Sequence, residues 1–200
     1  MTGAWRTTLS KTINLYIMTE QVVLVDENNK AIGSKDKSLV HNSNTPLHRA
    51  FSIFVFNKKG QLLIQQRSRH KKTFPLVWSN SCCGPPMPGE TSLNAIRRRL
   101  KDELNIKITD IHCILPDFRY NAEMNGIYEN EICPVYIGFT SEIPIINRNE
   151  VEAFKWVAWH KFIKIADSDD PYFSVWSKLE TKELLKSPKF RMLFKSAIGN

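Results

Sequence analysis

Long apolar segments are missing from this sequence: no run approaches the roughly 18 residues that a membrane-spanning helix needs. There is no apolar segment typical of a secretory signal, and none of the four cysteines belongs to a CxxC pair. No stripe of lysine and arginine is interleaved with aromatic residues. These absences argue against a membrane protein, a disulfide-bonded secreted domain and a nucleic-acid-binding protein, and they favour a cytoplasmic protein with reduced thiols. The formal net charge of +8 leaves an anionic small substrate, an anionic membrane surface or a solvated basic surface as explanations.

The composition bounds the number of domains. A hydrophobic content of 42% and a charged content of 24% in 200 residues are sufficient for one ordinary core, and the chain has no internal repeat or low-complexity tract. Residues 1–17 contain Arg6 and Lys11 but no acid. We interpret them as an N-terminal extension before a natural start at Met18, with a targeting segment as the alternative. Residues 18–200 are then expected to form a single domain.

Short β-branched and aromatic runs separated by polar turns predict strands in the first third of the chain. The expected strands are residues 21–25 with a partner at 31–33, and a hairpin of 51–56 and 61–67 closed by a turn at 57–60. Further extended segments are expected at 106–118, 129–139 and 154–159.

Helical periodicity follows residue 90. Apolar residues at steps of three and four predict a helix that ends near Asn105 and begins at a cap provided by Thr91 or Ser92. The expected core-facing stripe consists of Leu93, Ile96, Leu100 and Leu104. A short helix is expected within 160–170, and the tail beyond Phe173 is helical in pattern. The sum is an α+β fold, with a mixed sheet, a central helix and a helical C-terminus.

The stretch 78–90 (WSNSCCGPPMPGE) places the Cys83 thiol on what its Gly and Pro content predicts to be a turn. The helix after it carries Arg99 and Glu103 one turn apart. These two side chains suit either an i,i+4 ion pair or a magnesium–phosphate site with the acid on the metal.

Two more groups of residues could hold a metal. Glu129 and Glu131 share one face of a predicted strand, which suits a cation or acid–base chemistry as well as a plain solvent-facing strand. His41 and His48 lie seven residues apart with Pro46 between them, a spacing that is uninformative for either a helix or a strand. Imidazole together with carboxylate would suit zinc or manganese.

The spacing Gly84-x5-Glu90-x7-Arg98, followed by Asp102 and Glu103, resembles a degenerate Nudix box, although Arg99 and Asn105 stand where an acid and a glycine are usual. Three flanking segments, 78–84 (WSNSCCG), 115–120 (LPDFRY) and 128–135 (YENEICPV), are similar to the type I isopentenyl-diphosphate Δ-isomerase family. The resemblance covers residues 19–176. It implies an α/β/α sandwich that interconverts isopentenyl and dimethylallyl diphosphate in isoprenoid biosynthesis, by adding and removing a proton through a tertiary carbocation.

The resemblance also implies roles for individual residues. Cys83 and Glu131 match the acid–base pair, Tyr120 matches a tyrosine that supports proton transfer beside the glutamate, and Trp176 matches the ring that faces the cation. Diphosphate contacts are matched by Lys37, Arg67, Lys71 and Arg99.

Two metal sites are implied in the same way. Glu103 matches the ligand of a Mg²⁺ ion that also holds the diphosphate, and the ligands of a buried Zn²⁺ or Mn²⁺ ion are matched by His41, His48, Glu129 and Glu131. Pro85 departs from the family, because that position is normally a metal-binding histidine and proline offers no ligand atom. A weaker metal site, an impaired one and a tolerated gap all remain open.

Two other functions compete with the isomerase. A Nudix pyrophosphohydrolase would carry a glutamate at the position of Arg99, and a non-catalytic binder of isoprenoid diphosphates is supported by Pro85 alone. The expected partner is a small isoprenoid diphosphate, with no nucleic acid and no membrane span, for a chain that is a monomer or a weak dimer.

Overall fold

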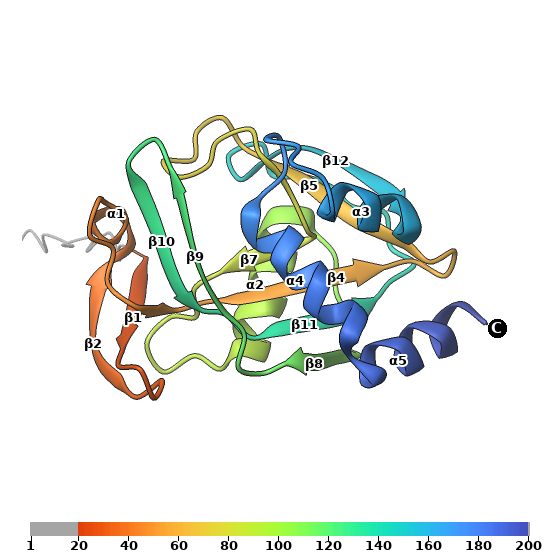
Figure 1. Ribbon diagram of the computed structural model, residues 1–200, viewed down its shortest axis with the longest axis horizontal. Coiled ribbons are helices and arrows are strands. Elements are labelled where there is room, and N and C mark those ends of the chain that lie inside the picture. The colour runs from red at the N-terminus through yellow and green to blue at the C-terminus, as the bar shows by residue number, and fades with distance from the viewer. Residues whose placement is uncertain (1–19, 200) are drawn as a thin grey trace, which may run out of the picture.

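The computed structural model describes residues 20–199, which form two sheets with flanking helices (Figure 1). The predicted extension 1–17 lies outside the described residues. Within the described part, the main path of the larger sheet runs in the order β12 (Val151–Ala158), β5 (Gln61–Arg67), β4 (Phe51–Phe56), β11 (Val135–Phe139) and β8 (Ile111–Leu115). The smaller sheet runs in the order β2 (Ala31–Asp36), β1 (Gln21–Val25), β3 (His48–Arg49), β10 (Ile127–Ile132) and β9 (Arg119–Met124).

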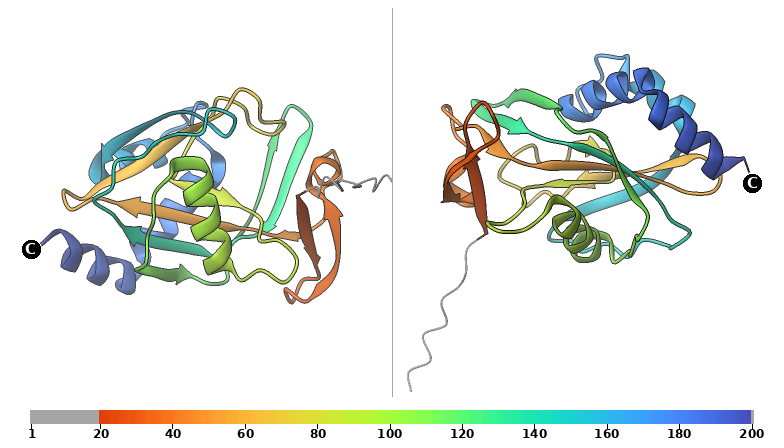
Figure 2. Two further views of the ribbon diagram at one scale, coloured as in Figure 1. Left: turned by 180° about the vertical axis from the view of Figure 1, so that it is seen from behind. Right: turned by 90° about the horizontal axis from the view of Figure 1, so that it is seen from below.

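Helices cover both faces of the larger sheet. The helices of the described chain are α1 (Lys37–Val40), α2 (Ser92–Leu104), α3 (Trp159–Ala166), α4 (Val175–Lys186) and α5 (Pro188–Ile198). Figure 2 shows α2 on one face and α3, α4 and α5 on the other. This arrangement confirms the predicted α+β class and its α/β/α layering. No helix between residues 20 and 199 is long and apolar enough to cross a bilayer.

The central strand β4 contributes to a core on each face of the sheet. Phe51, Ile53 and Val55 pack in the cluster that contains the buried residues of α2, whereas Phe54 and Phe56 pack with residues of α3 and α5. All six residues of β4 are buried, which explains why five of them are apolar and why the segment does not alternate between apolar and polar residues; the exception is Ser52.

Two chain segments cross from one sheet into the other. After β3 the chain enters β4 at Phe51, and after β10 it enters β11 at Val135. The two crossings run side by side, because β10 pairs in parallel with β3 and β11 pairs in parallel with β4. Residues on β3 and β10 are therefore held at the junction of the sheets.

Two short strands that follow β5 in the chain complete the larger sheet. β4 and β5 pair with each other at Phe56 and Leu62. Farther along, β6 (Trp78–Ser79) pairs with β5 and β7 (Cys82–Gly84) pairs with β4, so this inserted segment lies between the two strands. The Ser81 hydroxyl accepts a hydrogen bond from Val55 N at 2.7 Å and donates one to Leu63 O at 2.6 Å, so it bridges the two strands. The predicted turn around Cys83 was therefore wrong: Cys83 lies on a strand, because the inserted segment pairs with a strand distant in sequence.

The predicted helix around residue 96 is α2. Thr91 Oγ1 accepts from Asn94 N at 3.3 Å at its start, and Asn105 ends it in the left-handed conformation with φ of 52°. The predicted apolar stripe is partly wrong, because Leu93 is 37% exposed. Arg99 and Glu103 are instead buried on the inner side of the helix.

Other boundaries differ from the prediction. The segment expected to be extended at 106–118 is a strand only over β8, and β9 was not predicted. β9 and β10 form a hairpin whose turn residues Asn125 and Gly126 both have positive φ, of 54° and 77°. The turn signal was present in the sequence, but the polar residues of β9 concealed the strand.

Candidate active site

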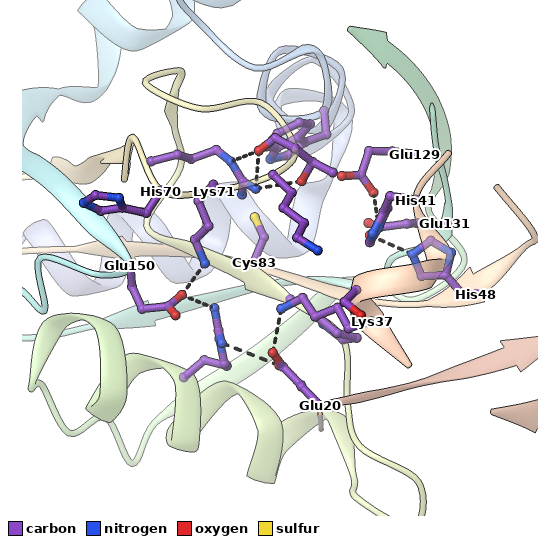
Figure 3. A pocket seen from close by; sticks show the side chains of 18 of the residues that line it. Glu20, Lys37, His41, His48, His70, Lys71, Cys83, Glu129, Glu131 and Glu150 are labelled. Atoms are coloured by element: carbon purple, nitrogen blue, oxygen red, sulfur yellow. Dashed lines mark hydrogen bonds and ion pairs between the residues drawn. The ribbon is translucent and has the colours of Figure 1, made fainter. Parts of the chain in front are cut away.

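A cavity of about 420 Å³ lies at the junction of the two sheets (Figure 3). It brings together most residues that the resemblance implied, although they come from segments between residues 37 and 176. Those that line it are Lys37, His41, His48, Arg67, Lys71, Cys83, Arg99, Tyr120, Glu129, Glu131 and Trp176, together with Pro85. Glu103 is not among the lining residues.

One side of the cavity is a cluster of two histidines and two glutamates. Alternation along β10 turns Glu129 and Glu131 inward, where both are buried, so the solvent-facing alternative is wrong for this strand. His48 faces Glu131 across the β3–β10 pairing, and His41 follows α1. One ligand atom from each of the four side chains lies within 4.8 Å of the others.

Within this cluster each histidine contacts one glutamate through the atoms that could bind a metal. His41 Nε2 is 2.9 Å from Glu129 Oε2, and His48 Nε2 is 3.3 Å from Glu131 Oε1. His48 Nδ1 lies 2.9 Å from the carbonyl of Pro46, which fits a proton on Nδ1, and Nε2 faces Glu131, where it could bind a cation in place of that contact.

The donor set fits a divalent cation. Glu129 Oε2 is buried and makes no hydrogen bond, although the His41 ring lies 2.9 Å away, and two imidazoles with two carboxylates suit zinc or manganese. Pro85 lines the same cavity and contributes no ligand atom. His70 also lines the cavity, from the basic loop after β5, although the sequence offered no reason to place it there.

Cys83 lies between this cluster and the Lys71–Glu150 pair (Figure 3). Its cross-strand partner on β4 is Ser52, whose Oγ is 3.4 Å from the sulfur, and its thiol donates to Asn80 Oδ1 at 3.2 Å. Burial raises the pKa of the Cys83 thiol, and the charge of Glu180 raises it further. The residue is therefore a neutral thiol at neutral pH.

Tyr120 and Glu131 form the second proton-carrying group. They are paired across β9 and β10, and the tyrosine hydroxyl donates to Glu131 Oε2 at 2.7 Å. Burial raises the pKa of Glu131, but hydrogen bonds from His48 and Tyr120 outweigh it, so the net pKa is lowered. Burial raises the pKa of Tyr120 well above its ordinary value. Glu131 is thus an ionised acceptor with a proton donor beside it.

Trp176 forms an apolar wall of the cavity. It lies in the first turn of α4, which Ser174 caps, and it is 3% exposed. Its ring packs edge-on against Phe74 and tilted against Tyr120, with centroid distances of 5.2 and 5.9 Å. The Arg67 guanidinium carbon lies 5.7 Å from the ring centroid, so a cation already faces this ring.

The opposite side of the cavity is basic. Lys37 pairs with Glu20 at 2.9 Å, and Lys71 pairs with Glu150. Arg99 contacts both of these acids, at 3.6 Å from Glu20 Oε1 and 3.0 Å from Glu150 Oε2. Burial raises the pKa of Glu150, but Arg99 and Lys71 outweigh this effect and keep it ionised. The prediction did not include Glu20 or Glu150. Each directly precedes a strand, β1 or β12, and neither belongs to a motif.

Glu103 forms the i,i+4 ion pair with Arg99 that was one of the two sequence interpretations, at 2.6 Å. Its carboxylate also accepts from Gln65 Nε2 at 3.1 Å and from the Cys82 thiol at 3.5 Å, and only 2% of the residue is exposed. The structure therefore places Glu103 beneath the basic side and apart from the histidine cluster. Its role as a Mg²⁺ ligand stays a prediction.

Comparisons with known proteins agree with this arrangement. The NUDIX domain model matches residues 46–176. An isopentenyl-diphosphate Delta-isomerase of Saccharopolyspora erythraea is 46% identical over 168 residues, which cover 84% of this chain and 87% of that protein. The protein of the same name from Mycolicibacterium vanbaalenii is 47% identical over 141 residues, covering 70% and 78% of the two chains.

Solved structures share the fold at low identity. The DR0079 protein of Deinococcus radiodurans aligns with a TM-score of 0.63 and 22% identity over 80% of this chain and 96% of that one. A MutT protein of Methanosarcina mazei aligns with a TM-score of 0.56 and 18% identity over 69% and 92%. These two show the fold alone, whereas the sequence relatives span most of both chains. On the family match and the relatives together, this chain belongs to the isopentenyl-diphosphate Delta-isomerase family of NUDIX-domain proteins.

Proposed function

We propose that this protein interconverts isopentenyl diphosphate and dimethylallyl diphosphate. One observation carries the proposal: two proton-carrying groups, Cys83 and the Glu131–Tyr120 pair, line a single cavity together with the Trp176 ring. The relatives that match most of the chain are named for this isomerisation. Their names and the residues that line the cavity support the same reaction.

The basic side of the cavity would bind the diphosphate. Lys37, Lys71 and Arg99 are paired there with Glu20 and Glu150, so an incoming diphosphate competes with two carboxylates for three cations. Arg67 is oriented by the Thr73 and Phe74 carbonyls, which accept from its guanidinium at 2.9 and 3.1 Å. Arginine and lysine are suited to phosphate oxygens. With the diphosphate on this side, the alkene extends toward Trp176.

The isomerisation adds a proton to one carbon of the alkene and removes a proton from another, through a tertiary cation. Cys83 and Glu131 approach the cavity from different sheets, which suits proton transfer on opposite faces of a planar alkene. Tyr120 would pass a proton to or from Glu131 through their 2.7 Å hydrogen bond. The face of Trp176 would stabilise the cation by about 0.5–2 kcal/mol.

We propose His41, His48, Glu129 and Glu131 as holders of Zn²⁺ or Mn²⁺, and Glu103 as a holder of Mg²⁺ at the diphosphate. A bound cation supplies positive charge that neutralises the carboxylates or the diphosphate oxygens. The convergence of four buried or half-buried ligand atoms within 4.8 Å supports the first site, while the ion pair between Arg99 and Glu103 would have to open for the second. We further propose a cytoplasmic enzyme that acts as a monomer or weak dimer.

The first test is to incubate the purified protein with isopentenyl diphosphate and Mg²⁺ and to follow dimethylallyl diphosphate and free phosphate together. We expect the dimethylallyl product without phosphate. Phosphate release would instead indicate a pyrophosphohydrolase. If neither product forms with added zinc or manganese, and isopentenyl diphosphate still binds, the protein is a binder and the proposed reaction is wrong.

A further inference from the structure

A further carboxylic acid, Glu180, does not line the cavity but lies behind Cys83, in contact with its cross-strand partner Ser52. Glu180 is one helical turn after Trp176 on α4, and it is 0% exposed. Its Oε1 atom is buried without a hydrogen-bond partner, and its Oε2 atom lies 2.8 Å from the Ser52 hydroxyl oxygen, which donates to the carboxylate and would accept from the protonated acid. A buried carboxylate with so little compensation is costly, so the neutral acid is favoured.

Among the described residues, the groups near Glu180 offer a negative charge one hydrogen bond and no positive charge. They are Ser52 on β4, the Cys83 and Cys133 thiols, and the Glu131 carboxylate on β10. Burial raises the pKa of Glu180 well above its ordinary value; the Ser52 hydrogen bond lowers it by less, and the charge of Glu131 adds a still smaller increase. The neutral, protonated form of Glu180 is therefore favoured.

Ser52 connects Glu180 to Cys83. It is the cross-strand partner of Cys83, with its Oγ 3.4 Å from Cys83 Sγ and 2.8 Å from Glu180 Oε2. Asn80 Nδ2 donates to the same oxygen at 2.8 Å, so one lone pair of Ser52 is occupied. The hydroxyl hydrogen and the other lone pair are left for Cys83 and Glu180, which is the arrangement needed to pass a proton in either direction.

We propose that Glu180 is a positioning residue that exchanges a proton with Cys83 through the Ser52 hydroxyl. When Cys83 gives its proton to the substrate, the Ser52 O–H proton moves to the sulfur and the Glu180 O–H proton moves to Ser52, which leaves a Glu180 carboxylate. When Cys83 takes a proton from the substrate, the same bonds break and form in reverse. The negative charge therefore leaves the sulfur without crossing to solvent. This role in turnover rests on the proposed isomerisation.

The decisive variant is Glu180→Gln, which has nearly the same shape and still hydrogen-bonds Ser52 but cannot pass a proton. We expect kcat to fall by about tenfold or more, with KM within about twofold and an unchanged melting temperature. Glu183→Gln is the matched control, because Glu183 lies on the same helix with its side chain 45% exposed and paired with Lys186. A kcat for Glu180→Gln within twofold of the wild type would overturn the proposal.

A double-variant cycle tests the path through Ser52. Ser52→Ala removes the connecting hydroxyl, so Ser52→Ala and Glu180→Gln should interrupt the same proton path. The double variant should then lose no more kcat than either single variant. Losses that multiply would mean that the two residues act separately and would contradict the relay. If Ser52→Ala does not fold, the Glu180→Gln comparison decides alone.

A readout that needs no turnover separates this proposal from the isomerase assignment. The pH dependence of Cys83 alkylation by iodoacetamide, followed by mass spectrometry against a Cys83→Ala blank, reports when the thiolate forms. In the wild type the thiolate forms beside an ionised Glu180, so we expect it at a lower pH in Glu180→Gln, where no carboxylate opposes it. An unchanged profile would overturn the coupling, whereas a shifted profile in a protein without isomerase activity would reject only the proposed function.

Discussion

At the scale of single residues, strand pairing positions the two proton-carrying groups of the cavity in different sheets. Cys83 is held opposite Ser52 on β4, and Glu131 is held opposite Tyr120 and His48 in the smaller sheet. Glu131 is buried, Cys83 is half-buried, and both are hydrogen-bonded, so their protonation states are set mainly by neighbouring groups. Removing either group should therefore affect chemistry more than folding.

We predict that Cys83→Ala and Glu131→Gln each reduce isomerisation by roughly 10²–10⁴-fold, because each removes one half of the proton transfer. Turnover of isopentenyl diphosphate and the far-ultraviolet circular dichroism spectrum should be measured together. Cys113→Ala is the control, since Cys113 lies on β8 and does not line the cavity. Near-normal turnover in either active-site variant would reject the acid–base assignment.

The next prediction concerns the residue that departs from the family. Pro85 is buried and lines the cavity beside the histidine and glutamate cluster. We expect Pro85→His to tighten Zn²⁺ or Mn²⁺ binding by about 10- to 100-fold, the range seen when one supporting residue of a metal site changes. Calorimetric titration of metal-depleted protein measures this. Pro88→His, at an exposed position, should change nothing, and the absence of a gain in Pro85→His would show that residue 85 is not at the metal.

At the scale of elements, the loop before α2 is fastened to the helix by one ion pair. Glu90 accepts from Arg98 Nε at 2.9 Å and Nη2 at 2.8 Å, and also from Met87 N at 2.9 Å. The Arg98 hydrogen bonds lower the pKa of Glu90. This ion pair joins the loop that follows β7, the strand of Cys83, to α2, the helix of Arg99. It therefore helps to fix the position of these two cavity residues relative to each other.

The lowered pKa gives a pH-dependent prediction. Because the folded protein holds Glu90 ionised more firmly than the unfolded chain does, its stabilisation is present above the unfolded pKa of about 4.3 and is lost as the pH falls through the lower folded value. Glu90→Gln should reduce the free energy of unfolding by about 1 kcal/mol at pH 7, and the difference should close toward pH 3. Urea unfolding across this range tests it. Asp117→Asn, at an exposed position, serves as the control, and a difference that persists in acid would contradict the prediction.

At the scale of the whole molecule, stability and chemistry occupy different ends of the sheet. Phe190 of α5 is 2% exposed and packs against Phe56 and Trp159, with ring centroids 6.1 and 5.5 Å apart. None of these three residues lines the cavity. The aromatic core beneath α5 therefore stabilises the sandwich without touching the site.

We predict that Phe190→Ala lowers the free energy of unfolding by about 3–5 kcal/mol, because it leaves a cavity in a closely packed core. Below the melting temperature, kcat should stay within about twofold of the wild type. Met192→Ala on the exposed side of α5, where Met192 is 64% exposed, should shift stability by less than about 0.5 kcal/mol. Equal effects of the two variants on denaturant unfolding would argue that α5 does not share the core.

Local features of the chain could be predicted from the sequence. The apolar run of β4, the cap and stop of α2 at Thr91 and Asn105, and the shared face of Glu129 and Glu131 all follow from periodicity or from one residue's conformation. Motif spacing also indicated the family and most residues that line the cavity. These signals are local because each depends on neighbours within a few positions.

Only the tertiary structure decided how distant segments meet. His41 and His48 have an uninformative spacing, yet their rings lie 5.2 Å apart because α1 returns the chain to β3. Cys83 is a strand residue because the segment that follows β5 pairs with β4, and the packing of α4 brings Glu180 to Ser52. Such contacts depend on pairing between segments that are far apart in sequence, and neither composition nor periodicity encodes which segments pair.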